Sequence, residues 1–290
     1  MYQDDVLSYC VVPVAGTFGW LFIYLLVEKG ISMDAFFIGL QFLTRLHVVK
    51  QTVWTEESFG KSVRFFPLVG LVLGLCYAGA AYLLFVLPEQ FNLSLPVHIR
   101  AVVLAVLPIL LTGGIHCDGF MDTVDGIFSG RSRERMLEIM KDSCAGSFGV
   151  VAFGIFLLLE YGTILDLPLE RLTAAMLLMP VVGRLMMVAA ISLYPYARPE
   201  GMGKAFAAYA NPRSFWLVFA YTLCLVVPFG WQGIFALCGA GAFTYCFARY
   251  VTGLLGGLTG DVYGAICTLS ELIVLVAYLC DLSIIHRIFF

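Results

Sequence analysis

Long stretches of this chain contain almost no charged side chains, and this pattern predicts its helices. The stretches are residues 65–87, 101–117, 143–159, 172–197, 214–248 and 262–285. As a single helix, 214–248 would be about 50 Å long at ~1.5 Å per residue, which exceeds a hydrocarbon core of roughly 30 Å. We therefore expect the Pro- and Gly-containing segment 228–233 to break it into a hairpin of two spans.

Composition indicates that these helices lie in a membrane. The 290 residues are 61% apolar and 13% charged, with a mean hydropathy of +0.92, whereas a soluble domain has about 25% charged residues. We predict an all-α fold, a polytopic integral membrane helical bundle of six to seven transmembrane helices. A formal net charge of −3 offers no basic surface for nucleic acid. The nine cysteines include no Cys-x-x-Cys pair, so we interpret them as small packing residues.

Lys and Arg are distributed unevenly between the loops. Segments 45–64, 116–146, 195–213 and 248–262 hold twelve of them, and the alternating segments hold three. The positive-inside rule therefore predicts that the first set faces the cytoplasm.

The first 34 residues are considered apart from 35–290, which we expect to form a single membrane-embedded catalytic domain. Residues 11–27 are apolar enough to span a membrane. A secretory signal peptide would require basic residues before them, and this sequence has none there. Residues 1–34 are either an extra helix or an N-terminal extension, which would be residues 1–32 if the chain starts at Met33, and both interpretations stay open.

The densest polar block of the chain follows the second apolar stretch, at residues 113–143. Asp118, Asp122 and Asp125 are spaced i, i+4 and i+7, which places them on one face of a helix. Aligned carboxylates repel one another, and each would cost ~2.5–3.5 kcal/mol in mid-bilayer. A divalent cation removes that cost, and ligands that are all hard oxygens favour Mg²⁺, with Mn²⁺ as an alternative. The competing interpretation is a solvated loop just outside the membrane.

Glycines and basic residues surround these carboxylates. The glycines are Gly113, Gly114, Gly119 and Gly126, and the basic residues are Arg131, Arg133, Arg135 and Lys141. Glycine permits a ligand to approach the backbone closely, and acidic metal ligands beside a cationic cluster suit a pyrophosphate-bearing substrate. The alternative for 131–142 is an interfacial helix with ordinary surface ion pairs. His116 is either a base or a structural histidine.

Three further groups of polar residues stand out. Asp261 follows a glycine-rich approach and begins the last apolar stretch, as a bare helix cap or as part of an anion site. Glu271 and Arg184 are predicted near mid-bilayer, where they are either functional or paired with each other. Arg198 and Glu200 lie in the sequence YARPEGMG, whose alternative is an ordinary loop.

Two functions from different classes fit this chemistry. The first is a metal-dependent membrane phosphotransferase, in which an incoming hydroxyl displaces a nucleotide from a pyrophosphate. The second is a secondary transporter, with Arg184 and Glu271 as midplane coupling groups and Pro108 and Pro228 in broken helices. Most polar residues gather at one predicted membrane face and no repeated half is evident, so we favour the enzyme.

The block 113–146 resembles the cobalamin synthase family, also called adenosylcobinamide-GDP ribazoletransferase. The residues that carry the resemblance are Gly113, Gly114, His116, Asp118, Gly119, Asp122, Asp125, Gly126, the run 132–143 and Gly146, together with 42–46, 65–70, Arg184, 196–203, GGLTGDVYGA and Glu271. A departure is the pair Thr252 and Gly253, where the family often has basic residues. The nearest competitor is a CDP-alcohol phosphotransferase, whose first motif is partly echoed here and whose second is not found.

The resemblance implies a Mg²⁺-dependent, multi-pass enzyme of the bacterial cytoplasmic (inner) membrane with its active site facing the cytoplasm. It would join adenosylcobinamide-GDP with α-ribazole or its 5′-phosphate to give adenosylcobalamin or its 5′-phosphate, plus GMP. The lipid bilayer is then an obligatory partner, and a homo-oligomer stays open.

We expect the following roles. The metal ligands are Asp118, Asp122 and Asp125, with Asp142 or Asp261 completing or supporting the set, and the base is His116 or an Asp. The substrate-binding residues are Arg131, Arg133, Arg135 and Lys141 for the pyrophosphate, with Gly113, Gly114, Gly126, Arg198, Glu200, Arg184, Asp261 and Glu271.

Overall fold

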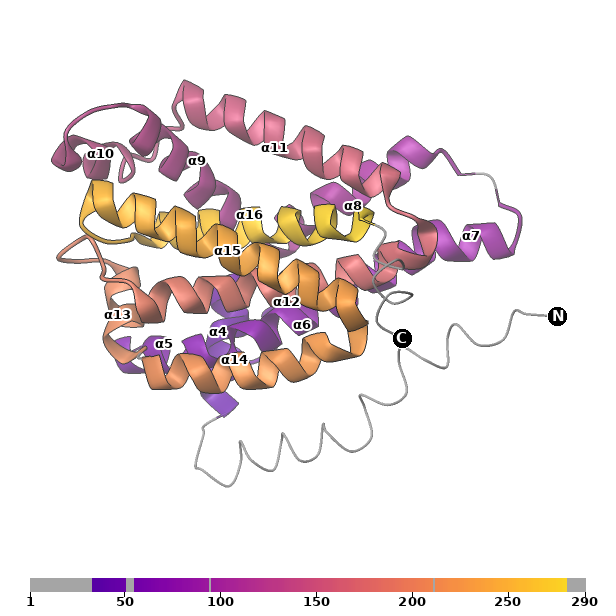
Figure 1. Cartoon of the computed structure of the whole chain (residues 1–290), viewed down its shortest axis with the longest axis horizontal. Coiled ribbons are helices and arrows are strands. Elements are labelled where there is room, and N and C mark those ends of the chain that lie inside the picture. Colours follow the sequence, from indigo (N-terminus) through magenta and orange to yellow (C-terminus); the bar gives the residue numbers. More distant parts are fainter. Residues whose placement is uncertain (1–32, 51–54, 94, 211, 281–290) are drawn as a thin grey trace.

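The computed structural model describes residues 33–50, 55–93, 95–210 and 212–280, and within them it is helical without a strand (Figure 1). The helices are α4 (Met33–Leu43), α5 (Glu56–Ser62), α6 (Phe66–Ala81), α7 (Leu87–Gln90), α8 (Val97–Thr112), α9 (Ile115–Phe128), α10 (Arg133–Ile139), α11 (Ser147–Asp166), α12 (Leu169–Leu193), α13 (Met202–Tyr209), α14 (Pro212–Val226), α15 (Gly230–Leu255) and α16 (Gly260–Leu279). The segment 11–27 lies outside the described residues, so both interpretations of the N-terminus stay predictions.

Several helical stretches are long and apolar enough to cross a membrane. Among the described residues there are five, namely Glu56–Gln90, Ser147–Asp166, Leu169–Leu193, Pro212–Leu255 and Gly260–Leu279. The number becomes six when α8 and α9, which are bent by 92°, count together as one span. The predicted all-α, multi-pass membrane bundle is therefore confirmed.

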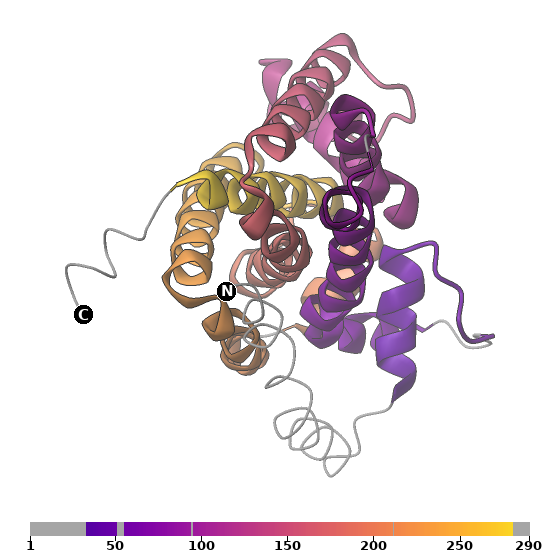
Figure 2. The ribbon, with the colours of Figure 1, turned by 90° about the vertical axis from the view of Figure 1, so that its right-hand side faces the viewer.

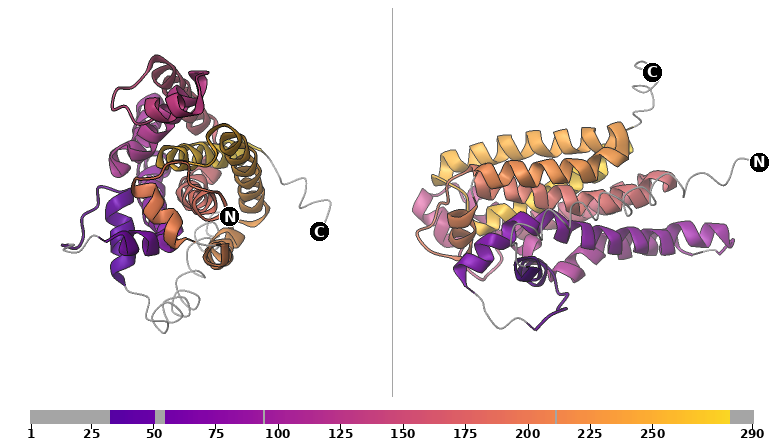
Figure 3. Two further views of the ribbon diagram at one scale, coloured as in Figure 1. Left: turned by 90° about the vertical axis from the view of Figure 1, so that its left-hand side faces the viewer. Right: turned by 90° about the horizontal axis from the view of Figure 1, so that it is seen from below.

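The expected hairpin within 214–248 is also present. The turn Val227–Phe229 ends α14, and Gly230, with a φ of 61°, begins α15 in a conformation that reverses the chain. Figures 1 and 3 show α14 and α15 running in opposite directions along the bundle.

Helix α12 forms the centre of the bundle. Of its most apolar 18 residues 89% are buried, against 28% for the peripheral α11, and Figure 2 shows α12 surrounded by the other helices. Glycines of α6 allow the close contact between α6 and α12: a Cβ on Gly70 would lie 2.9 Å from the Cα of Val181, and one on Gly74 would lie 3.0 Å from the Leu177 carbonyl carbon. The core is therefore built around α12, whose buried residues include a single charged one, Arg184.

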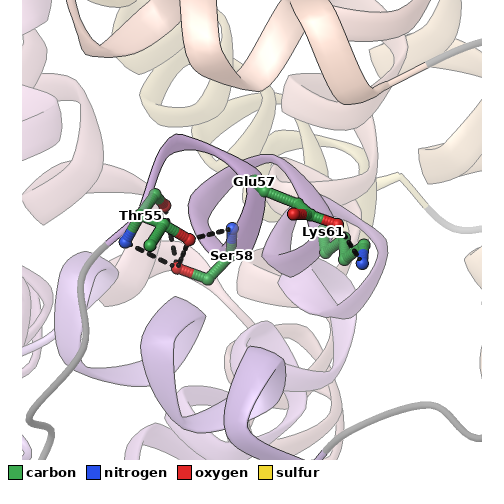
Figure 4. Close-up of polar contacts among 4 residues, drawn as sticks. All are labelled: Thr55, Glu57, Ser58 and Lys61. Atoms are coloured by element: carbon green, nitrogen blue, oxygen red, sulfur yellow. Dashed lines mark hydrogen bonds and ion pairs between the residues drawn. The ribbon is translucent and has the colours of Figure 1, made fainter.

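Short helices cover the end of the bundle that carries the polar motifs. Helix α5 begins at a capping box, in which Thr55 Oγ1 accepts from the Ser58 amide at 3.2 Å and Ser58 Oγ accepts from the Thr55 amide at 3.0 Å (Figure 4). Glu57 and Lys61 pair on its exposed side. Figure 1 shows α5, α10 and α13 at this same end, with the start of α16.

Candidate active site

A double-glycine turn directs α9 away from the span that precedes it. Gly113 and Gly114 both have positive φ, 67° and 76°, and the axes of α8 and α9 differ by 92°. Side chains other than glycine rarely adopt that conformation. A Cβ on Gly113 would also lie 2.7 Å from the guanidinium carbon of Arg45. These two glycines therefore shape the backbone and leave room for Arg45.

The three aspartates of α9 differ in their surroundings. Asp118 is exposed, Asp122 is half-buried, and Asp125 is only 7% exposed. The carboxylate of Asp125 accepts hydrogen bonds from the amides of Gly146, at 2.7 Å, and Gly149, at 2.9 Å. These amides belong to the N-cap and first turn of α11, whose positive dipole end favours a carboxylate. Asp125 thus ties α9 to α11.

This role for Asp125 can be tested through stability. Asp125→Ala is expected to lower the free energy of unfolding by about 2 kcal/mol, because a buried cap is lost and two amides lose their acceptor. The measurement is thermal unfolding of the detergent-purified protein. Asp142→Ala is the matched control, because Asp142 is exposed and accepts one bond, from the Cys144 amide at 3.0 Å. Equal losses for both variants would contradict this role.

Asp261 joins Asp118 and Asp122 from the start of α16. A Cβ on Gly119 would lie 2.8 Å from the Asp261 carbonyl oxygen, so the α9 glycine allows the two helices to touch there. Asp261 pairs with Arg198 at 2.8 Å and accepts from the Thr259 hydroxyl at 3.1 Å. We call Asp118, Asp122 and Asp261 the acidic site.

Two motifs that are far apart in the sequence meet beside the acidic site. The amide of Ala197 donates to the Leu258 carbonyl, and the amide of Leu258 donates to the Pro195 carbonyl, both at 2.8 Å. A Cβ on Gly257 would lie 2.6 Å from the Pro195 carbonyl oxygen, which explains a glycine at this position. The loop YARPEGMG is therefore paired with GGLTGD, and Arg198 reaches Asp261 for this reason.

Negative charge accumulates in the acidic site. The pKa of Asp122 is raised from 3.8 to about 7, mainly by burial and further by the carboxylates of Asp118, Asp261 and Asp125, while Arg198 opposes the shift. A cation that binds beside this carboxyl group stabilises its charged form. The oxygen donors are of the type that Mg²⁺ prefers. In the described part of the chain, however, no three His, Cys, Asp or Glu side chains already converge as a complete metal site.

The predicted basic cluster has several different partners. Arg133 donates to the carbonyls of Leu255, at 2.7 Å, and Ala197, at 3.3 Å, so it connects α10 to the end of α15 and the 197 loop. Arg135 pairs with Glu138 at 2.8 Å on the exposed side of α10. Arg131 and Lys141 are exposed, and neither forms an ion pair with a carboxylate of the described residues. These two cations are therefore available to a ligand.

Other predicted site residues lie elsewhere. Arg184 and Glu271 are buried and form an ion pair with each other inside the bundle, away from the acidic site. His116 is 5% exposed and faces a cavity beside Glu271. Gly126 packs against α10, where a Cβ would lie 2.9 Å from the Met140 sulfur. Glu200 is exposed in its loop.

Sequence reasoning assigned no role to two residues that the structure makes prominent. Arg45 lies against the Gly113–Gly114 turn, and its amide donates to the Leu111 carbonyl at 2.7 Å. Its presence in the matched segment 42–46 was the available signal. Glu160 is 5% exposed inside the bundle. It ended an uncharged stretch in the sequence and therefore resembled a membrane boundary.

Comparison with known proteins decides the family. The family described as cobalamin-5-phosphate synthase matches residues 35–279, most of the chain. The chain belongs to this family. The predicted resemblance to cobalamin synthase and the prediction of an enzyme are therefore confirmed, and the chain is a transferase of cobalamin biosynthesis.

Relatives of the cobalamin synthase family match more than four fifths of the chain. Proteins named adenosylcobinamide-GDP ribazoletransferase are similar to this chain, and one from Desulfitobacterium hafniense strain Y51 is 39% identical over 84% of this chain and 96% of the relative. The protein of that name from Roseiflexus sp. strain RS-1 is 40% identical over 82% of this chain and 86% of the relative. The one from Alkaliphilus oremlandii strain OhILAs is 38% identical over 87% of this chain and 100% of the relative. No solved structure matches.

Proposed function

We propose that this protein joins adenosylcobinamide-GDP with α-ribazole, or with α-ribazole 5′-phosphate, to give adenosylcobalamin, or its 5′-phosphate, and GMP. The observation that carries the proposal is the agreement between the relatives' names and the acidic site. Relatives that match more than four fifths of the chain are named for this activity. The named reaction is a displacement at a pyrophosphate. Clustered carboxylates that can hold a metal ion, with unpaired cations nearby, suit this chemistry.

The reaction exchanges one phosphorus–oxygen bond for another. The 3′-hydroxyl of ribazole attacks the phosphorus that is attached to cobinamide, and the bond between that phosphorus and the bridging oxygen breaks. GMP leaves with the bridging oxygen, and the hydroxyl proton passes to a base. Carboxylates of the acidic site are better placed to take this proton than His116, because His116 is buried and faces the interior cavity.

Each described residue then has a distinct task. Asp118 and Asp122 would hold Mg²⁺, with Asp261 beside them and water completing the coordination. The metal would neutralise negative charge on the pyrophosphate oxygens. Arg131 and Lys141 supply cations for the same oxygens. Arg198 holds Asp261 in place through the 2.8 Å ion pair and limits the net charge of the site.

The positive-inside distribution supports a cytoplasmic active site in the bacterial inner membrane. The loops around the acidic site hold Arg131, Arg133, Arg135, Lys141, Arg198 and Lys204. A nucleotide-activated substrate is also hydrophilic at its phosphates, so a site that opens toward water suits it.

The raised pKa of Asp122 predicts a pH dependence of metal use. Mg²⁺ binds the carboxylate, so protonation below a pKa of about 7 competes with the metal. The Mg²⁺ concentration for half-maximal turnover should fall by up to about 10-fold per pH unit as the pH rises from 6 to 7, and level off above 8. Steady-state rates at pH 6, 7 and 8 measure it.

The same shift makes a prediction for stability without metal. The pKa of Asp122 is higher in the folded protein than its ordinary value of 3.8, so the folded state binds more protons between these values. Metal-free stability should therefore fall as the pH rises from about 4 to 7. Arg198→Gln should move the pH dependence of the half-maximal Mg²⁺ concentration and that of metal-free stability to higher pH. Asp142→Asn should leave both pH dependences in place. A half-maximal Mg²⁺ concentration that is constant from pH 6 to 8 would refute this account.

A substrate comparison tests the proposal itself. The purified protein in lipid nanodiscs is incubated with adenosylcobinamide-GDP and α-ribazole, and in parallel with a CDP-activated lipid and an alcohol. We expect GMP and a completed corrinoid only from the first pair. CMP from the second pair alone would preserve the phosphotransferase chemistry and overturn the substrates, and no nucleotide from either pair in folded protein would overturn both.

A further inference from the structure

A small cavity with a mixed apolar and polar lining lies inside the bundle, separate from the acidic site. Its volume is about 20 Å³, and its polar lining consists of Thr112, His116, Glu160, Thr268 and Glu271. A single water molecule needs roughly 10–15 Å³ of such volume and two to four polar partners. The cavity therefore has the size and the lining to hold one water molecule.

Two of the lining groups are buried and have no partner among the described residues. His116 is 5% exposed, and its Nε2 makes no hydrogen bond there. Glu160 is also 5% exposed, and it forms no ion pair with a cation of the described residues. A buried polar group without a hydrogen-bond partner destabilises the fold. One bridging molecule would satisfy both groups at once.

We propose that a water molecule occupies this cavity and connects Glu160 and Glu271 to Nε2 of His116, and that Glu160 is thereby a positioning residue for α9. His116 is in the first turn of α9, two residues before Asp118 and six residues before Asp122. Helix α16 already fits closely against the His116 backbone, since a Cβ on Gly264 would lie 3.3 Å from its Cα. The water would fix the side chain as Gly264 fixes the backbone.

This inference rests on the proposed function for its consequence in catalysis. If the start of α9 rotates or shifts, Asp118 and Asp122 change their distance from Asp261 on the neighbouring helix. Mutation of a residue that orients a metal ligand without binding the metal typically lowers metal affinity or activity by about 10–100-fold. Glu160 reaches neither substrate nor metal in this account, so its effect appears in turnover and in the Mg²⁺ requirement rather than in substrate KM.

A double-mutant cycle tests the connection between Glu160 and His116. Glu160→Met, His116→Met and the double variant are compared with the wild type by thermal unfolding in nanodiscs. If one water joins the two side chains, either single change disrupts the same bridge. The loss of stability in the double variant should then be clearly smaller than the sum of the losses in the two single variants. Glu170→Met is the control, because Glu170 is exposed in the first turn of α12.

Activity adds a second readout. Glu160→Met should lower kcat and raise the half-maximal Mg²⁺ concentration, by a combined factor of about 10–100, with substrate KM nearly constant. Glu160→Gln keeps a hydrogen-bonding group and should recover most of that loss. Additive unfolding effects, or a Gln variant as impaired as the Met variant, would overturn the proposal. The double-mutant cycle is measured by unfolding and needs no substrate. An inactive wild type would therefore refute the proposed function, while the cycle would still test the connection between Glu160 and His116.

A spectroscopic measurement applies even if the Met variants fail to fold. In wild-type protein labelled with ¹⁵N-histidine, solid-state NMR should show magnetisation transfer from water protons to Nε2 of His116. The signal is assigned by its absence from His116→Asn, and Glu160→Gln should change its chemical shift. A His116 signal without water transfer in the wild type would overturn the proposal.

Discussion

Replacing Asp122 by Asn is expected to lower turnover on the order of 10²–10³-fold even at saturating Mg²⁺, a loss typical of removing one electrostatic contact to a transition state. The substitution preserves side-chain size and removes one charge from the acidic site. Burial, together with the neighbouring carboxylates of Asp118 and Asp261, raises the pKa of Asp122. Steady-state GMP release at several Mg²⁺ concentrations measures the effect.

Stability should respond to Asp122→Asn in the opposite direction. Repulsion between the carboxylates opposes folding in the absence of metal, so the Asn variant should unfold at an equal or higher temperature than the wild type in EDTA. Mg²⁺ should stabilise the wild type and have little effect on the variant. Asp142→Asn is the matched control. The sequence offered Asp142 as an alternative to Asp261 in the metal site, but its carboxylate accepts from the Cys144 amide and is not among the charges that raise the pKa of Asp122, so this variant should retain turnover and the response to Mg²⁺. Near-normal turnover of Asp122→Asn would exclude Asp122 as a metal ligand.

Replacing Arg184 by Met is expected to be the most destabilising single change, by about 3–5 kcal/mol. Arg184 is fully buried in the central helix α12, and its partner Glu271 is 8% exposed. Without Arg184, Glu271 stays inside the bundle without its cation, near Glu160. Thermal unfolding and the yield of monodisperse protein in detergent measure the loss.

A compensating change separates charge pairing from packing. The double variant Arg184→Met with Glu271→Gln removes both charges and should recover a large part of the loss, because no single buried charge is left. If the double variant is no more stable than Arg184→Met alone, the pair contributes through the volume of the arginine rather than through its charge.

The membrane fold was predictable because charge is nearly excluded from the spans. The absence of charged residues over 214–248, with Pro228 and Gly230 between two apolar halves, was sufficient to predict a hairpin. The direction of α9 was not predictable. It depends on the backbone conformation of Gly113 and Gly114, which a sequence permits without requiring.

The candidate site was predictable in its residue types more than in their partners. Helical spacing placed Asp118, Asp122 and Asp125 on one face, but the contact of Asp125 with two amides depends on where α11 begins in space. Likewise Arg133 resembled a phosphate ligand in the sequence, and tertiary structure gives it the carbonyls of Leu255 and Ala197. Asp261 reaches the site through the contact at Gly119, 142 residues before it in the chain.

Following the phosphorus atom tests the central proposal most directly. Adenosylcobinamide-GDP labelled with ³²P at the phosphate attached to cobinamide is incubated with α-ribazole and the nanodisc-embedded protein, with Mg²⁺ or with EDTA. Our account predicts that Mg²⁺ allows all converted label to enter the completed corrinoid, that GMP is released unlabelled, and that EDTA stops both. Label in the released nucleotide, or equal conversion in EDTA, would contradict the account.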